Sequence, residues 1–269
     1  MVAAEDESRM PLMDHLVELR RRLIWCIIAF VICFLISYYF AQDIFLYLAE
    51  PLRRALEGQP NAHMVFTAMT EAFFTQMKLA FFTAAFFSFP LVSLQVWKFV
   101  APGLYKHEQR AFLPFLVATP ILFLMGAALA YYMIFPLAWH FLLSFQVMGS
   151  SDTMPIEVLP KVDQYLSISL QLIFAFGIAF EMPVLLTLLA RAGIISSAGM
   201  AAKRRYAIVG VVAVAAVLTP PDMISMFALA IPMIVLYEIS ILCARQIEKS
   251  RDKAAKEAEA ASGTTEQGA

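Results

Sequence analysis

Residues 23–42 read L-I-W-C-I-I-A-F-V-I-C-F-L-I-S-Y-Y-F-A-Q, a run of 20 residues without a single charged side chain. At about 1.5 Å per residue, a helix of this length spans the roughly 30 Å hydrocarbon core of a bilayer. A helix also satisfies its backbone hydrogen bonds within one segment, which a bilayer requires. The stretch therefore predicts a transmembrane helix.

The composition of the whole chain agrees with this prediction. Of the 269 residues, 61% are hydrophobic and only 15% are charged, and 23 are Phe. An ordinary soluble domain is close to half apolar and about a quarter charged. The first 22 residues are polar, and no small-residue cleavage site follows the apolar run, so we expect no cleaved signal peptide.

Five further apolar segments follow the first. The third contains Pro114, Pro120 and Pro136 and is predicted to bend, and Glu181 interrupts the fourth. A turn at T-P-P-D separates the fifth and sixth segments, which are predicted to be short. The fold class is thus all-α, a polytopic membrane protein. The six predicted spans are residues 23–42, 72–97, 111–139, 164–190, 206–219 and 223–244.

The distribution of Lys and Arg predicts the orientation of these spans. Sixteen of the 20 cations lie before the first span, after the second, after the fourth, or in the tail. By the positive-inside rule, both termini are cytoplasmic and six spans connect them. We expect a single membrane domain over residues 1–245. The charged tail, 246–269, is predicted to continue as a helical extension and then to become disordered.

The segment between the first two spans faces the opposite compartment. Within it Ile44, Leu48, Leu52 and Leu56 recur every four residues. This spacing predicts an amphipathic helix that lies over the apolar bundle, with Pro51 shaping it.

Several classes of function are poorly supported. The four His residues form no H-E-x-x-H motif, and neither G-x-S-x-G nor a Walker A motif occurs, so no catalytic, metal or cofactor site is expected. Cys26, Cys33 and Cys243 lie in apolar runs without metal-ligand spacing and are expected to be buried thiols. No nucleic-acid partner is expected either.

One alternative is a proton-coupled secondary transporter of a small solute. Glu181 lies in the middle of a predicted span, where a proton-coupling carboxylate would be found. The span lengths show no two-fold repeat, and paired interrupted helices, which mark many carrier sites, are missing from the pattern. The transporter is therefore the second interpretation.

Two motifs carry a resemblance to a known family. H-L-V-E-L-R-R-R-L at 15–23, followed by F-V-A-P-G-L-Y-K-H-E at 99–108, resembles TatC, the multispanning receptor subunit of the twin-arginine translocase. Further matches occur in the same order along the chain. They are A-E-P-L at 49–52, T-E-A-F-F-T-Q-M-K at 70–78, F-E-M-P-V at 180–184, K-R-R-Y at 203–206 and L-T-P-P-D at 218–222.

The resemblance implies a function in protein transport. A protein of this kind recognises twin-arginine signal peptides of folded cargo at the cytoplasmic face of the bacterial inner membrane. It works in homo- and hetero-oligomers with the single-span partners TatA and TatB and uses the proton-motive force. It has no enzymatic activity of its own.

The resemblance also implies roles for individual residues. Glu18 and Glu108 match the carboxylates assigned to the twin-arginine motif, and Arg20 matches a supporting basic position. Glu181 matches an intramembrane acid that contacts TatA or TatB. Many members carry Gln four residues after the Asp of T-P-P-D, where this chain has Met226.

Physical chemistry supports the assignment of the two carboxylates. Each guanidinium of a signal peptide is a planar donor fork that a carboxylate accepts bidentately, whereas Lys is a point charge. Glu18 and Glu108 lie at cytoplasmic span ends among cations. The simpler alternatives are that Glu18 pairs with Arg22 and that Glu108 is solvated or pairs with Arg110.

The remaining residues of interest have structural or supporting roles. Lys78, near the outer end of the second span, is expected to snorkel, with Glu71 on the same helix face as a candidate partner. The other residues in this group are Pro51, Pro220 and Asp222.

Overall fold

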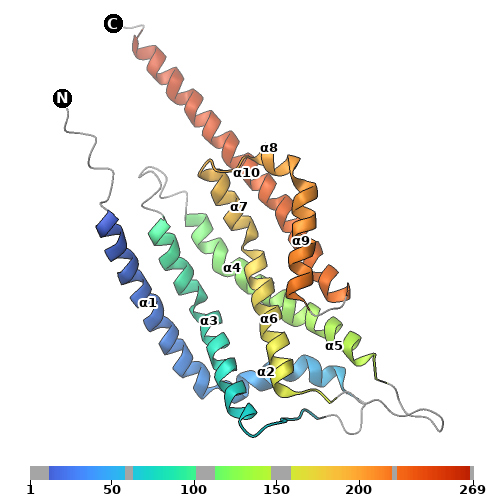
Figure 1. The fold of residues 1–269 in the computed structure, drawn as a ribbon. Helices are drawn as coiled ribbons and strands as arrows, with labels where there is room; N and C mark the ends of the chain where they lie inside the picture. The colour runs from blue at the N-terminus through green and yellow to red at the C-terminus, as the bar shows by residue number, and fades with distance from the viewer. Residues whose placement is uncertain (1–11, 58–62, 101–112, 147–158, 220–222, 267–269) are drawn as a thin grey trace. The chain divides into compact units, whose positions relative to one another are not determined.

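The computed structural model describes residues 12–57, 63–100, 113–146, 159–219 and 223–266, and they are predominantly helical (Figure 1). The predicted all-α class is confirmed. Among these residues an isolated β-bridge, between Val65 and Lys161, is the one β pairing. The predicted site or supporting residues Glu108, Pro220 and Asp222 lie outside the described residues.

Within the described residues, five helical segments are long and apolar enough to cross a membrane. The helix of the predicted fifth span, α9 (Arg204–Leu218), has 15 residues. Its length of about 22 Å is less than the thickness of the hydrocarbon core. The count of six crossings therefore stays a prediction. The five segments are Leu16–Tyr39, Glu71–Phe99, Phe115–Leu143, Val162–Arg191 and Met223–Ser250.

The last helix differs from the prediction. Residues 223–244 were expected to form a short span and 246–269 a tail that becomes disordered, but α10 (Met223–Glu266) is continuous over 44 residues. The expected helical extension therefore reaches Glu266. The reason is local: Ala, Glu and Lys, which dominate the tail, have high helix propensity, and no Pro follows Pro232.

The contacts divide the chain into two compact units, where a single domain was expected. Unit 1 comprises Met1–Ile121 and Leu143–Leu170, and unit 2 comprises Leu122–Leu142 and Gln171–Ala269. The helices α4 (Leu113–Leu129) and α6 (Val162–Phe180) contribute residues to both units.

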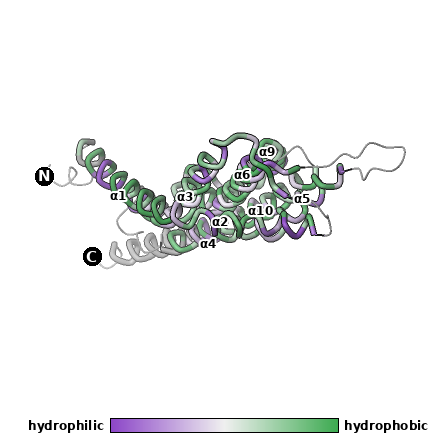
Figure 2. Tube along the Cα trace, turned by 90° about the horizontal axis from the view of Figure 1, so that it is seen from below, coloured by the Kyte–Doolittle hydropathy of each residue, from purple (hydrophilic) through white to green (hydrophobic). Residues whose placement is uncertain are grey.

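In unit 1 the main packing is between two long helices. α1 (Leu12–Tyr39) lies along α3 (Glu71–Val100), and the ring of Phe30 meets the edge of Phe81 at a centroid distance of 5.1 Å (Figure 1). The N-terminal leucine stripe and the first predicted span form one helix, because no Gly or Pro lies between them. Figure 2 shows that most of α1 is hydrophobic, with a hydrophilic patch toward its N-terminal end.

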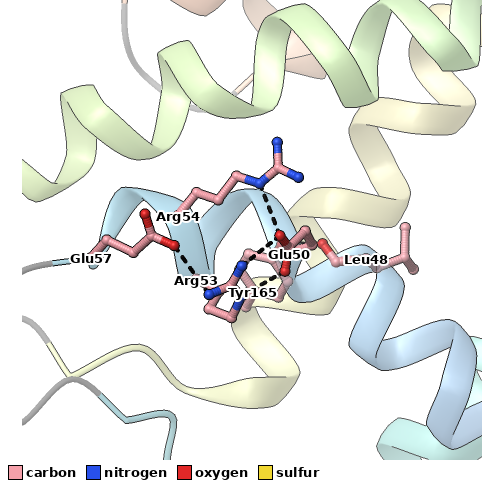
Figure 3. A network of polar contacts seen from close by, with 6 residues as sticks. All are labelled: Leu48, Glu50, Arg53, Arg54, Glu57 and Tyr165. Atoms are coloured by element: carbon pink, nitrogen blue, oxygen red, sulfur yellow. Dashed lines mark hydrogen bonds and ion pairs between the residues drawn. The ribbon is translucent and has the colours of Figure 1, made fainter.

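The predicted amphipathic helix is confirmed as α2 (Ala41–Ala55). Leu48, Pro51 and Leu52 are buried on one side, and Leu56 is buried just after its end. The hydroxyl of Tyr165 on α6 donates to the Leu48 carbonyl at 2.5 Å, which ties the two helices together (Figure 3).

The other side of α2 carries an exposed ion-pair network (Figure 3). The Glu50 carboxylate accepts from Arg53 at 2.6 and 2.7 Å and from Arg54 at 2.9 Å, and Arg53 also donates to Glu57 at 3.1 Å. These bonds stabilise the ionised carboxylate and lower the pKa of Glu50 to about 2. The network therefore stays charged over the physiological pH range and makes this face of α2 polar.

Lys78 has a different partner from the one expected. Its ammonium pairs with Asp163 at the start of α6 and donates to the Ser167 hydroxyl at 2.9 Å. Glu71, the candidate partner, instead accepts from the amide and the hydroxyl of Thr67 at 2.6 and 2.9 Å. That part of the prediction is wrong, because the Glu71 carboxylate instead binds the amides of Thr67 and Ala68 in the turn that precedes α3.

The third predicted span is not one regular α-helix, because its backbone hydrogen-bonding pattern changes just before Pro136. α4 is followed by a π-helical turn, Ala130–Ile134, and by α5 (Phe135–Leu143). The amide of Phe135 bonds to the Ala130 carbonyl, five residues earlier. Pro136 has no amide proton and cannot continue the α-helical ladder, which explains a wider turn just before it.

In unit 2, α10 contacts α7 (Met182–Arg191), α8 (Ser197–Ala202) and α9. The carboxylate of Glu248 accepts from the amide of Ser197 at 2.7 Å and also bonds its hydroxyl, so it caps α8. The hydroxyl of Tyr237 donates to the Met200 carbonyl at 2.9 Å. The buried cluster between these helices consists of Ala190, Met200, Tyr237, Ile241 and Ala244.

Two glycines allow α4 and α6 to approach closely in unit 2. A Cβ atom on Gly126 would overlap the backbone carbonyl oxygen of Phe176, and one on Gly177 would lie 2.6 Å from the ring of Phe123. The overlap at Gly126 involves backbone, which cannot move without shifting the helix. Gly210 on α9, by contrast, has nothing within 4 Å of the Cβ position.

We therefore expect Gly126→Ala to destabilise the protein by about 1–3 kcal/mol, the usual cost of overpacking. The measurement is thermal unfolding of the purified protein in detergent. Gly210→Ala is the matched control, and its melting temperature should equal or slightly exceed that of the wild type because Ala favours a helix. Equal melting temperatures for the two variants would contradict the close packing.

Candidate functional site

The carboxylate of Glu18 is held by an ion pair in unit 1. The guanidinium of Arg22, one turn later on α1, donates to Oε1 of Glu18 from Nε at 3.0 Å and also from Nη2. Nη1 of Arg22 lies 3.4 Å from Oε1 of Gln95 on α3. The side chains of Arg22 and Glu18 are 20% and 24% exposed, so the pair is only partly hydrated.

These residues line a pocket of about 310 Å³, which we call the α1–α3 pocket. Four of its lining residues share one face of α1, because their positions follow the i, i+3, i+4, i+7 spacing of a helix, and two lie one turn apart near the end of α3. The six residues are Glu18, Arg21, Arg22, Trp25, Gln95 and Lys98.

The pocket offers an acceptor for a cationic group. Within the described residues, both hydrogen bonds to the Glu18 carboxylate fall on Oε1. Oε2 is therefore left to accept from an incoming donor. The Trp25 side chain, 57% exposed, adds an aromatic face on which a guanidinium can stack.

Not every predicted site residue joins this pocket. Arg20 is exposed and is not among the lining residues, because it lies two positions from Glu18 and so on another side of the helix. Glu108 is outside the described residues, in the segment 101–112 that follows α3 directly. Of the predicted signal-peptide residues, the structure thus places Glu18 in the pocket.

Glu181 lies in unit 2 at the break between α6 and α7 and is 8% exposed. Its amide bonds to the Ile178 carbonyl at 3.0 Å, and its own carbonyl accepts from Leu185 at 3.0 Å. The break occurs here because Pro183 lacks the amide proton that a continuous helix would use. The predicted interruption of the fourth span is confirmed.

Gln95 is one of the pocket residues that the sequence did not point to, together with Arg21, Trp25 and Lys98. It lies within the charge-free run of the second predicted span, and only its polar amide distinguishes it from its neighbours. A polar side chain near the end of an apolar helix was the available signal. Its contact with Arg22, 73 positions away, depends on how α1 and α3 pack.

In the part of the chain that the structure describes, no group of three or more His, Cys, Asp or Glu side chains could hold a metal ion. The charged side chains that line the α1–α3 pocket offer the reversible pairing of charges.

Comparison with known proteins gives a consistent result. A model of the family described as "Sec-independent protein translocase protein (TatC)" matches residues 14–232. The Sec-independent protein translocase protein TatC of Magnetococcus marinus is 48% identical over 255 residues, which cover 94% of this chain and 91% of the relative. The Escherichia coli K12 protein of the same name is 41% identical over 250 residues, which cover 92% and 93% of the two chains.

Solved structures give the same family. A crystal structure of the twin arginine translocase receptor TatC matches with a TM-score of 0.72 and 39% identity, over 87% of this chain and 99% of that chain. A second structure of this receptor, titled as being in DDM, matches with the same TM-score and 40% identity. From its sequence motifs, its apolar helices and these matches, the chain is a multi-pass membrane protein that belongs to the TatC family.

Proposed function

We propose that this chain is the receptor subunit of a twin-arginine protein translocase, which binds twin-arginine signal peptides and transports folded cargo. The observation that carries the proposal is the Glu18 carboxylate, held among cations in a pocket at the ends of two apolar helices of a TatC-family chain. The relatives and crystal structures bear names that describe this activity.

Recognition would proceed by exchange of charge partners. In the free protein Arg22 occupies Oε1 of Glu18. A signal-peptide guanidinium would approach Oε2, stack against Trp25 and replace part of the Arg22 contact. One charge-assisted pair replaces another in this exchange. The higher affinity for an Arg-Arg peptide than for a Lys-Lys peptide comes from the bidentate fork that Arg presents and Lys does not.

Two further residues complete the proposed site. Glu108, in the segment after Lys98, would accept the second guanidinium of the peptide, and Arg20 would support the same surface from outside the pocket. The basis for these two assignments is the match of their motifs to the family.

We expect Glu18→Gln to weaken the binding of a twin-arginine signal peptide. A hydrogen bond to a charged group contributes about 1.5–3 kcal/mol, so the affinity should fall roughly 10- to 150-fold, and toward the lower value if Arg22 already uses most of the carboxylate. Glu108→Gln should have a similar effect. The measurement is the Kd of a fluorescent signal peptide and of its Lys-Lys variant with the protein in detergent.

The control for this experiment is Glu50→Gln. It also removes a carboxylate held by two arginines, but on α2, and should leave the peptide Kd unchanged. Wild type should prefer the Arg-Arg peptide strongly, and Glu18→Gln should lose most of that preference. If Glu18→Gln and Glu108→Gln both kept the wild-type preference, the twin-arginine site would lie elsewhere in the chain.

The proposed orientation places both termini and the α1–α3 pocket on the cytoplasmic side of a bacterial inner membrane. It rests on the bias of 16 of the 20 cations toward one side of the six predicted spans. Orientation matters to function, because a signal peptide arrives from the side on which cargo is synthesised.

Reporter fusions test this topology. Fusions after Arg110, after Arg205 and at the C-terminus should report the cytoplasm, whereas fusions near Pro60 and Asp152 should report the opposite compartment. A fusion after Arg205 that reports the outside would contradict the model of six crossings, because four spans are predicted before that residue.

We further propose that the receptor acts with TatA- and TatB-like single-span partners in an oligomer driven by the proton-motive force. Glu181 is the proposed contact residue, because its motif F-E-M-P matches the intramembrane acid of the family, and its side chain, 8% exposed, lies in an apolar segment. A polar side chain on a partner helix would reach the small exposed part of it.

Glu181→Ala should reduce crosslinking to a single-span partner and export of a folded reporter, while the Kd of the signal peptide changes little. Glu181→Gln, which keeps a hydrogen-bonding amide, should retain more crosslinking. Glu238→Ala, which removes an exposed carboxylate paired with Arg204 at 2.7 Å, is the control and should behave as wild type. Loss of proton-coupled uptake of a small solute in Glu181→Ala, with export intact, would favour the transporter instead.

A further inference from the structure

The α1–α3 pocket carries more positive charge than the binding of a cationic peptide requires. Three cations, Arg21, Arg22 and Lys98, line it together with one carboxylate, Glu18. Arg22 is paired with Glu18, but within the described residues neither Arg21 nor Lys98 takes part in an ion pair. These two side chains repel an arginine peptide. The positive-inside rule accounts for cations at this end of the spans, but not for the convergence of two unpaired ones on a single pocket.

The position of the pocket relative to the apolar helices is informative. Glu18 to Trp25 lie at the beginning of the apolar segment Leu16–Tyr39, and Gln95 and Lys98 lie at the end of Glu71–Phe99. Both ends of a membrane-spanning segment lie at the level of the lipid headgroups. Trp25, 57% exposed, is the residue type enriched at that level.

We propose that the α1–α3 pocket binds the phosphate of an anionic lipid headgroup through Arg21 and Lys98. A guanidinium fork and an ammonium from two different helices converge on one pocket, and phosphate accepts from both kinds of donor. Basic pockets between membrane helices are known sites for anionic headgroups. The volume of about 310 Å³ lies at the lower end of the range for small-molecule sites.

The surface next to the pocket favours a lipid over free phosphate as the source of this group. Trp25, Ile28 and Ile32 continue the pocket face of α1 at three- and four-residue spacing. Their side chains are 57%, 43% and 54% exposed. They form an apolar stripe that leads from the pocket into the membrane, along which an acyl chain can lie. Free phosphate would make no use of this stripe.

A bound phosphate would also weaken the ion pair between Glu18 and Arg22. Arg22 lies in the same pocket, and a phosphate would compete with Glu18 for its guanidinium. Glu18 would then be released to accept another cation. The lipid site nevertheless stands apart from the proposed function, because Arg21 and Lys98 would hold a phosphate whether or not signal peptides bind to Glu18.

Native mass spectrometry of the full chain in detergent tests the proposal. The probes are phosphatidylglycerol and phosphatidylcholine with identical acyl chains, titrated in a buffer without phosphate. Wild type should bind phosphatidylglycerol more tightly than phosphatidylcholine. The double variant Arg21→Gln/Lys98→Gln should weaken phosphatidylglycerol binding roughly 25-fold, or about 5-fold for each cation, and should leave phosphatidylcholine binding unchanged.

Two control variants separate a specific site from general charge and from misfolding. Lys203→Gln/Arg205→Gln removes two exposed cations at the start of α9 and should bind phosphatidylglycerol as wild type does. Arg21→Lys/Lys98→Arg keeps both charges and should retain most of the binding. Equal loss in the α9 control and in the pocket variant would overturn the proposal, as would equal binding of the two lipids by wild type.

A final arm distinguishes the two sources of phosphate. Inorganic phosphate at millimolar concentration, added to the protein with phosphatidylglycerol bound, should displace little of the lipid. Two results together would assign the site to free phosphate and overturn the lipid proposal. Inorganic phosphate would displace the lipid, and phosphate alone would bind to wild type but not to Arg21→Gln/Lys98→Gln. Peptide binding is no part of this readout, so its outcome is independent of the proposed receptor function.

Discussion

A charged side chain at hydrocarbon depth in this chain needs a partner, because hydrocarbon offers it none. Lys78 lies in the second apolar segment, and its ammonium is satisfied by Asp163 and Ser167 on α6. Hydroxyl groups follow the same rule within a helix, as Ser240 bonds to the Leu236 carbonyl at 2.7 Å. The pairing of Lys78 with Asp163 also specifies which faces of α3 and α6 meet, so it constrains the packing as well as stabilises it.

The same constraint gives the α1–α3 pocket its properties. At the boundary between apolar helix and headgroup, charges are only partly hydrated, and Glu18 and Arg22 pair with each other. A ligand of either sign can enter by exchange. In the proposed receptor function a guanidinium would replace Arg22 on Glu18, and in the proposed lipid site a phosphate would draw Arg21, Arg22 and Lys98 toward itself. Both proposals involve the one ion pair between Glu18 and Arg22.

Local patterns predicted the helices well, because the thickness of the bilayer sets their length and their hydrogen bonds are internal. The charge-free run at 23–42 was sufficient to predict the helix α1. The four-residue spacing of Ile44, Leu48, Leu52 and Leu56 was sufficient to predict the helix α2. Two details that the patterns did not specify also have local causes. The helical extension of α10 reaches Glu266 through its Ala, Glu and Lys content, and a π-helical turn precedes Pro136.

The sequence by itself determined that this is an all-α membrane protein of the TatC family and that Glu18 lies among cations near the end of a span. Only the tertiary structure decided that Gln95 and Lys98 line the pocket of Glu18, that Arg20 does not, and that Lys78 pairs with Asp163. The physical reason is sequence separation. The contacts Arg22–Gln95 and Lys78–Asp163 join residues 73 and 85 positions apart, and helix periodicity specifies only which residues share a face, not which face of another helix they meet.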